Sequence, residues 1–280
     1  MVGVPGPPGT MAPMRIVTAN VNGIRAAARR GGMAWLQQAE PDVLCLQEVR
    51  ASDTQLAAEL HAGGFGDWHV AHAACATAGR AGVAVLTRAP HARVQVELPG
   101  VEEFASCGRW VETDVVVGGR TVTLVSVYVH TGEAETERQE EKYRFLEAMT
   151  TRMAELAAEG AHVVVSGDVN VAHRQADLKN WKGNLGKAGF LPDEQAYLDK
   201  WLADGAWVDV TRRSAGEVAG PYTWWSWRGK AFDNDAGWRI DYQLASAPLA
   251  DLVTHTFVGR ADTYAERWSD HAAVVADYDL

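Results

Sequence analysis

Nine polar residues lie at the ends of apolar stretches in this sequence, where strands are expected to stop. They are Asn20, Asn22, Glu48, Tyr128, Asp168, Asn170, Asp241, Asp270 and His271. The set contains carboxylates, amides and one histidine but no cysteine, and such oxygen-rich donors suit Mg²⁺ or Mn²⁺ better than zinc. Metal-assisted attack of water on phosphorus is the chemistry that these residue types fit.

The clearest pair follows an apolar run near the middle of the chain. Residues 163–165 are valines, Ser166-Gly167 follow, and Asp168 and Asn170 come next. Side chains at i and i+2 of an extended backbone point to the same side, so this pair is expected to face one site at a strand end. The alternative is an Asp/Asn turn that caps its own backbone.

The elements that must position these residues can be inferred from apolar periodicity. Strands are expected over 15–19, 43–46, 82–86, 91–98, 110–117, 121–129, 163–165, 222–227, 238–242 and 272–278. Helices are expected over 25–39, 53–61, 135–158 and 193–203. Many strands, few helices and a hairpin turn at Gly118-Gly119 predict an α/β fold with two packed sheets and helices outside.

Length and composition indicate a single domain. The chain has 280 residues, without a repeat or linker, and residues 14–280 are expected to form that domain. Residues 1–13 are rich in Gly and Pro, and we expect a disordered lead-in there, with Met14 as the possible true start. No apolar run approaches the roughly 20 residues of a membrane span. Three cysteines without CxxC spacing predict a reduced, cytoplasmic protein.

The net charge of −10 argues against a protein that coats long stretches of nucleic acid, because such proteins are usually basic. It does not exclude an enzyme, since acidic side chains can be metal ligands. Residues 133–159 alone carry eight glutamates against four basic residues. Much of the imbalance is therefore expected on one solvated helix.

Five motifs, NVNGIRA, LQE, GDVNVAH, GWRIDY and SDH, occur in this order, with the NWKGN loop and GFLPDEQ between them. Together they resemble the exonuclease III family of abasic-site endonucleases, within the endonuclease/exonuclease/phosphatase superfamily, from Met14 to Leu280. The resemblance implies a DNase I-like four-layer α/β sandwich of two packed mixed β-sheets flanked by helices. It implies a Mg²⁺-dependent DNA-repair phosphodiesterase, with Mn²⁺ as a substitute, that cuts 5′ to abasic sites and acts as a 3′-5′ exonuclease.

The same resemblance implies a monomer acting on double-stranded DNA with abasic sites or 3′ ends. It makes Glu48 the principal metal ligand, with Asn22 near the metal and Asp270 as a secondary metal or histidine-supporting residue. Asn20, also placed at the metal site, would hold the phosphate together with Tyr128.

For the chemical step, the resemblance implies that Asp241 orients His271 and favours its charged form. Asp168, supported by Asn170, would position and deprotonate the attacking water. The alternative is that His271 is the base and Asp168 positions the water.

Trp224, Trp238 and Ile240 match the family's apolar pocket for an extruded, baseless sugar, although buried tryptophans are also common in a plain core. Possible contacts to the DNA backbone are Arg25, Lys182 and Arg228. After Tyr128 the family commonly has proline and asparagine, whereas this chain has His130 and Thr131.

Two other functions remain open on the same evidence. One is a non-specific nuclease or a phosphatase on the same scaffold, and the other is a nucleic-acid-binding protein that has lost its chemistry. The intact polar set argues against the second.

Overall fold

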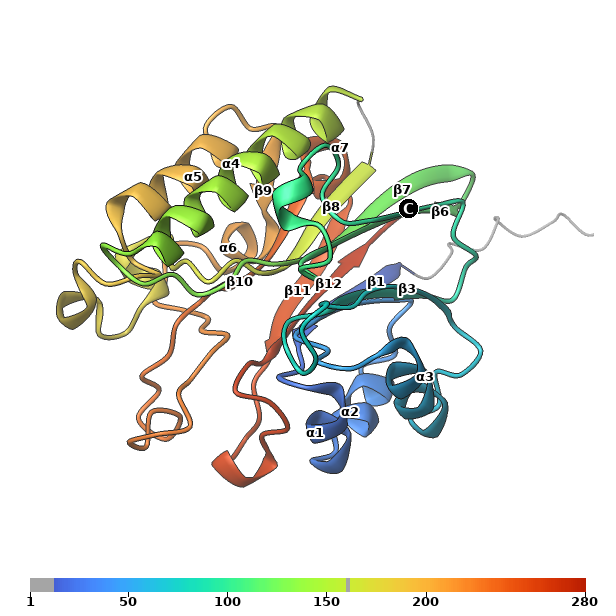
Figure 1. The fold of residues 1–280 in the computed structure, drawn as a ribbon, viewed down its shortest axis with the longest axis horizontal. Helices are drawn as coiled ribbons and strands as arrows, with labels where there is room; N and C mark the ends of the chain where they lie inside the picture. The colour runs from blue at the N-terminus through green and yellow to red at the C-terminus, as the bar shows by residue number, and fades with distance from the viewer. Residues whose placement is uncertain (1–12, 160–161) are drawn as a thin grey trace, which may run out of the picture.

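Two six-stranded sheets pack against each other, and helices cover their outer faces (Figure 1). The computed structural model describes residues 13–159 and 162–280. The lead-in expected over 1–13 lies, apart from Pro13, outside the described residues. The expected α/β fold of two packed mixed sheets with helices outside is confirmed.

The first sheet has the order β11-β12-β1-β2-β4-β3. Its strands are β1 (Met14–Asn20), β2 (Val43–Gln47), β3 (His69–Ala73), β4 (Val83–Thr87), β11 (Val253–Gly259) and β12 (Ala273–Tyr278). β1 is parallel to β2 and antiparallel to β12, so the first and last strands of the fold lie side by side in the middle of the sheet. Its outer face packs on the helices α1 (Ile24–Arg29), α2 (Gly32–Gln38) and α3 (Asp53–Ala62).

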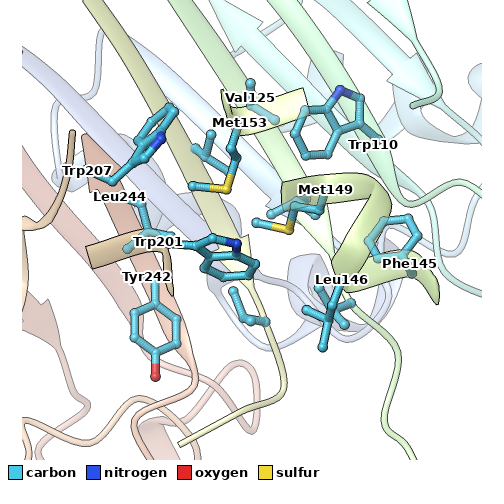
Figure 2. Packing of buried hydrophobic residues seen from close by; sticks show 14 of the residues in the cluster. Trp110, Val125, Phe145, Leu146, Met149, Met153, Trp201, Trp207, Tyr242 and Leu244 are labelled. Carbon is cyan, nitrogen blue, oxygen red and sulfur yellow. The ribbon is translucent and has the colours of Figure 1, made fainter. Parts of the chain in front are cut away.

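The second sheet has the order β5-β6-β7-β8-β10-β9. Its strands are β5 (Arg93–Val96), β6 (Trp110–Val117), β7 (Arg120–Tyr128), β8 (His162–Asp168), β9 (Trp207–Asp209) and β10 (Asp241–Ser246). The long helix α4 (Glu137–Ala158) and α5 (Pro192–Leu202) lie on its outer face. Figure 2 shows the contact, in which Met149 and Met153 of α4 pack with Trp201 of α5 and with the strand residues Trp110 and Leu244.

The remaining elements are short. They are the helices α6 (Val210–Ala215) and α7 (Ala247–Ala250) and the 3₁₀ turns η1 (Glu102–Phe104), η2 (Gln175–Asp177), η3 (Trp181–Asn184) and η4 (Tyr264–Glu266). Within the described residues, no helix is long and apolar enough to cross a membrane.

Hydrogen bonds between the sheets fix their relative position. Gln47 of β2 donates its Nε2 to Ser126 Oγ of β7 at 3.0 Å. Gln243 of β10 donates its Nε2 to the carbonyls of Ile16 and Val274, each at 3.0 Å. All these side chains are buried, and a buried amide without a hydrogen-bond partner costs free energy. These hydrogen bonds therefore favour one alignment of the two sheets.

Two expected elements differ from the structure. The helix expected over 25–39 is divided into α1 and α2, because Gly31 adopts φ 87° between them and ends the first helical run. The strand expected over 222–227 is wrong, since Trp224 forms only isolated bridges to Trp238 and to His271. Its aromatic residues belong to an irregular segment in which Tyr222 and Trp225 are buried, and strands β3, β9 and β11 were not expected at all.

Candidate active site

Strand ends from both sheets meet at one place. Asn20 ends β1, Tyr128 ends β7, and Asp168 ends β8, where it is paired in register with Tyr128 and with Asp241 at the start of β10. Glu48 directly follows β2, which runs parallel to β1. The topology therefore gathers side chains that are up to 221 positions apart in sequence, the span from Asn20 to Asp241.

Asp168 is buried, with 1% of its surface exposed, and it receives several hydrogen bonds. Its Oδ1 accepts from the backbone N–H of Asn170 at 2.9 Å, and its Oδ2 accepts from Asn20 Nδ2 at 2.9 Å and Asn170 Nδ2 at 3.1 Å. Gly167 precedes it with φ 146°, and a Cβ there would lie 2.0 Å from the carbonyl oxygen of Val127. Only glycine allows this approach, so it fixes where the Asp168 carboxylate points.

Asn20 links two carboxylates. Its Nδ2 donates to Glu48 Oε1 at 2.8 Å as well as to Asp168 Oδ2, and its Oδ1 accepts from the N–H of Asn22 at 3.0 Å. Glu48 also forms an ion pair with Arg50. A single neutral amide thus holds two like charges close together.

His271 lies between two further carboxylates. Its Nδ1 is 2.8 Å from Asp241 Oδ2, and its Nε2 is 3.8 Å from Asp168 Oδ2. Burial acts to lower the pKa of His271, but Asp241 and Asp168 outweigh it and raise that pKa to about 10. His271 is therefore a cation at neutral pH, with its Nδ1–H donated to Asp241.

The pKa of Asp168 is raised well above its usual value. Burial is the largest cause, His271 opposes it, and Asp241 and Glu48 add to it. The pKa of Tyr128 is also raised, by burial and then by the same Glu48 and Asp168 charges. We call the five residues Asn20, Glu48, Asp168, Asp241 and His271 the acidic cluster; it has three carboxylates and one cation.

The cluster fits a hard divalent cation. Glu48, Asp168 and His271 each have a ligand atom within 4.8 Å of those of the other two. The carboxylate oxygens of Glu48 and Asp168 are the kind of ligand that Mg²⁺ and Mn²⁺ prefer. A cation would also relieve the repulsion among these carboxylates.

Asn22 and Asp270 form the neighbouring rim. Asn22 donates its Nδ2 to Asp270 Oδ1 at 2.7 Å, and Trp224 donates its Nε1 to Asp270 Oδ2 at 3.2 Å. The rim therefore joins the acidic cluster to the aromatic residues beside it.

A cavity of about 330 Å³ opens directly on the acidic cluster. It is lined by Glu48, Thr131, Asp168, Asn170, Ala188, Gly189, Trp224, Trp238, Ile240, Asp270 and His271. The rings of Trp224 and Trp238 meet edge to face with centroids 6.2 Å apart, and both side chains are half-buried. We call this cavity the aromatic slot.

The structure does not bring every sequence-predicted residue to this place. Arg25, Lys182 and Arg228 are exposed and line neither the slot nor the cluster. Lys182 instead lies over the ring of Trp181, with its Nζ 5.5 Å from the centroid. Thr131, which stands where the family commonly has asparagine, lines the slot and donates its Oγ1 to Asn170 Oδ1 at 3.3 Å.

One buried ion pair behind the slot was missed by the sequence analysis. Lys142 of α4 is 2.6 Å from Glu194 Oε1 of α5, and both side chains are fully buried. Lys142 also donates to the carbonyl of Asn170 at 2.8 Å, while Glu194 Oε2 accepts from the N–H groups of Gly189 at 2.6 Å and Leu191 at 3.0 Å. The pair thus fixes Asn170 and the Gly189 wall of the slot.

A second buried network supports the opposite wall. Arg239, fully buried between Trp238 and Ile240 in sequence, donates to Asp177 at 2.6 Å and to Asp209 at 2.6 Å. The only sequence signal was the arginine of the GWRIDY motif, and its acidic partners lie on distant segments.

Comparison with known proteins agrees with this geometry. The model of the Endonuclease/Exonuclease/phosphatase family matches residues 17–271. An exodeoxyribonuclease of Bacillus subtilis (strain 168) is 32% identical over 262 residues, covering 93% of this chain and 98% of its own length.

Solved structures are similar as well. An AP endonuclease from Archaeoglobus fulgidus has a TM-score of 0.84 at 26% identity, covering 95% of this chain and 100% of that one. A Neisseria protein, described in one structure as a 3′-5′ exonuclease and in another as a 3′ phosphatase bound to a product DNA hairpin, has a TM-score of 0.81 in both, at 29% and 28% identity. Both cover 95% of this chain and 100% of their own.

The chain therefore belongs to the endonuclease/exonuclease/phosphatase family. Within it, the relatives are exodeoxyribonucleases and AP endonucleases, which are metal-dependent phosphodiester hydrolases, and this chain is an enzyme of that type. The resemblance to the exonuclease III family and the DNase I-like four-layer fold are confirmed.

Proposed function

We propose that this enzyme hydrolyses DNA 5′ to abasic sites and removes nucleotides from 3′ ends, with Mg²⁺ as the cofactor and Mn²⁺ as a substitute. The observation that carries the proposal is the aromatic slot of about 330 Å³, whose walls include Glu48, Asp168 and His271. A sugar without a base is easily extruded from the helix and is small enough for such a slot. The reacting phosphate of that nucleotide then lies at the acidic cluster.

In the proposed mechanism, Glu48 is the principal metal ligand, with Asn20, Asn22 and Asp270 around the same position. The bound cation would stabilise the departing 3′ oxygen and the charge on the phosphate. Asn20 and Tyr128 would hold the phosphate oxygens. His271, held as a cation by Asp241, would add a positive charge next to the phosphate.

We assign the general base to Asp168 and not to His271. A histidine whose pKa is about 10 already carries its proton at neutral pH and cannot accept another. The Oδ2 of Asp168 lies 3.8 Å from His271 Nε2, and the pKa of Asp168 is raised chiefly by burial. Asn170 orients it through two hydrogen bonds to its oxygens, so the water would be held for in-line attack.

Trp224, Trp238 and Ile240 would form the walls that select the baseless sugar. Arg25, Lys182 and Arg228 remain candidates for contacts to the DNA backbone away from the slot. We propose a monomer as the active form. The three free cysteines support a cytoplasmic protein.

One assay tests the proposal. The enzyme is incubated with Mg²⁺ and, separately, with a duplex carrying an abasic analogue, a duplex with a recessed 3′ end, an intact duplex and an inositol phosphate. We expect incision 5′ to the abasic analogue, slower shortening of the recessed 3′ end, and no reaction in excess chelator. Preference for the inositol phosphate would favour the phosphatase alternative, and equal cutting of the intact duplex would favour a non-specific nuclease.

A further inference from the structure

A second cavity lies against Glu48 and does not include the tryptophans of the aromatic slot. Its volume is about 670 Å³, roughly twice that of the slot, and Glu48 is the residue that lines both. Four arginines line it, Arg50, Arg80, Arg109 and Arg138, and Glu48 is the only carboxylate among its lining residues. In a chain with a net charge of −10, this concentration of positive charge marks a place for an anion. We call it the arginine-lined cavity.

Two of these arginines carry charge that no carboxylate neutralises at close range. In the part of the chain that the structure describes, neither Arg80 nor Arg138 has an acidic partner within the 4.0 Å of an ion pair, whereas Arg50 is paired with Glu48. Arg138 donates its Nε to the carbonyl of Thr131 at 2.7 Å, which fixes the side chain without cancelling its charge. Both are exposed, so their guanidinium groups are accessible to a ligand.

Arg109 adds a donor that lacks an acceptor. Its Nη1 pairs with Glu141 at 3.0 Å, but its buried Nε–H has no hydrogen-bond partner among the described residues. Leaving a buried donor unpaired costs about 1–3 kcal/mol, more when the group is charged. The Arg109 side chain lines the cavity, where its charge adds to those of Arg80 and Arg138. Burial raises the pKa of the Cys107 thiol in the same wall, so that thiol adds no negative charge.

We propose that the arginine-lined cavity binds the phosphodiester next to the reacting one, on the strand segment that keeps the 3′ hydroxyl after cleavage. The proposal rests on the proposed function, in which the aromatic slot holds the sugar on the 3′ side of the reacting phosphate. Glu48 lies between the two cavities, so a strand that enters the slot on one side of the metal position continues into the arginine-lined cavity on the other. Guanidinium groups suit this ligand because they match phosphate oxygens bidentately.

The test uses a double variant, Arg80→Ala with Arg138→Ala, and a matched control, Arg120→Ala with Lys200→Ala. Both remove two positive charges from exposed positions, but the control positions lie on the β6–β7 hairpin and on α5, outside the cavity. Affinity for a duplex containing a tetrahydrofuran abasic analogue is measured by fluorescence anisotropy in chelator, over a range of salt concentrations. Melting temperatures check the fold.

We expect the double variant to bind about tenfold more weakly than the control. The slope of log affinity against log salt should fall by about 1, since the cavity is proposed to hold one phosphate and each lost phosphate contact contributes roughly 0.9. An unchanged slope, equal to that of the control, would overturn the proposal.

A second measurement identifies which phosphate is bound. A neutral methylphosphonate replaces the linkage immediately 5′ to the reacting phosphate, and affinity is compared with the unmodified duplex. Wild type and control should lose affinity, whereas the double variant should lose clearly less, because two of the four arginines that line the cavity are already gone. An equal loss of affinity in all three proteins would contradict the assignment of this phosphate to the arginine-lined cavity.

The same duplexes separate this proposal from the proposed function. If wild type with Mg²⁺ does not incise the unmodified abasic duplex, the proposed function fails, whatever the binding data show. If incision occurs but the double variant keeps the salt slope of the control, only the arginine-lined cavity loses its role.

Discussion

Buried charges are arranged differently in the acidic cluster and in the ion pairs behind the aromatic slot. Within the cluster, the carboxylates of Glu48, Asp168 and Asp241 share one cation, His271, with Arg50 pairing Glu48 from outside the cluster, and the pKa values of Asp168 and His271 are raised. Behind the slot, each buried cation has a close carboxylate, as in Lys142 with Glu194 and Arg239 with Asp177. Unbalanced charge provides chemistry and a metal site, and balanced charge provides rigidity.

The largest effect on the rate should come from a substitution in the acidic cluster. Asp168→Asn removes the proposed base while keeping shape, so the rate of abasic incision should fall by about 10²- to 10⁴-fold. Stability without metal is measured separately, because one of several mutually repelling carboxylate charges is lost while the new amide NH₂ faces a hydrogen-bond donor. Single-turnover rates and thermal melting in chelator measure the two quantities. A loss of rate below tenfold would remove Asp168 from the chemistry.

Glu194→Gln should show the opposite pattern. It leaves the buried Lys142 ammonium without a counter-charge and turns an amide NH₂ toward donors, so unfolding should become easier by about 3–5 kcal/mol. Urea unfolding measures this, with Glu147→Gln as the control. Glu147 forms an exposed pair with Lys200 at 3.5 Å, and its loss should cost less than about 1 kcal/mol.

The double variant Lys142→Met with Glu194→Leu sharpens this test, because it removes both charges and should recover part of the stability, while the backbone groups of Gly189, Leu191 and Asn170 lose their side-chain partners. If it is as unstable as Glu194→Gln, the unpaired charge is not the cause. Recovered stability with impaired incision would show that the pair also positions Asn170.

His130 lines the arginine-lined cavity and should give a smaller, pH-dependent effect. Burial lowers the pKa of His130 to about 4, and the charge of Arg109 adds to this. An unfolded histidine has a pKa near 6.5, so the unfolded state takes up a proton first as the pH falls. The contribution of His130 to the free energy of unfolding is therefore fully present above about pH 6.5. It is lost between about pH 6.5 and 4, by up to about 3 kcal/mol.

Thermal melting of wild type and His130→Gln across that range measures the effect. The variant should lose less stability between neutral and acid pH than wild type does. Parallel curves for the two proteins would show that other groups cause the acid sensitivity.

The smallest effect is expected at the slot wall. Trp238→Ala enlarges the slot without touching the acidic cluster, so it should reduce the preference for abasic over ordinary nucleotides by roughly tenfold, in line with pocket contacts of 1–3 kcal/mol. The measurement is the ratio of kcat/KM on an abasic duplex to that on an intact 3′-recessed duplex. If both rates fall together with melting temperature and the ratio stays fixed, Trp238 is only a core residue.

The contrast between the two regions also explains what the sequence could reveal. Asp168 and Asn170 follow a valine run at a spacing of two, and the strand period alone predicts that they share a side. Gln47-Glu48 could be found in the same way, because each ends an apolar run.

The buried ion pairs behind the aromatic slot leave no such pattern in the sequence around each residue. Lys142 and Glu194 are 52 positions apart, and Lys142 lies in a helix whose many glutamates suggested only a solvated surface. Whether one lysine of such a helix is buried depends on what packs against it. The same holds for residues 222–227, whose density of aromatic residues predicts a strand, although Trp224 forms only isolated bridges to Trp238 and to His271.

The central pairing of β1 with β12 has a consequence for the making of this protein. Met14 pairs with Tyr278, and Asn20 and His271 meet in one site, although the ribosome produces them some 250 residues apart. While the chain is being synthesised, β1 has no β12 beside it and the histidine of the site does not yet exist. A nascent chain that lacks β12 is therefore expected to be inactive. The enzyme becomes able to cleave DNA only when β12 pairs with β1 and completes the sheet.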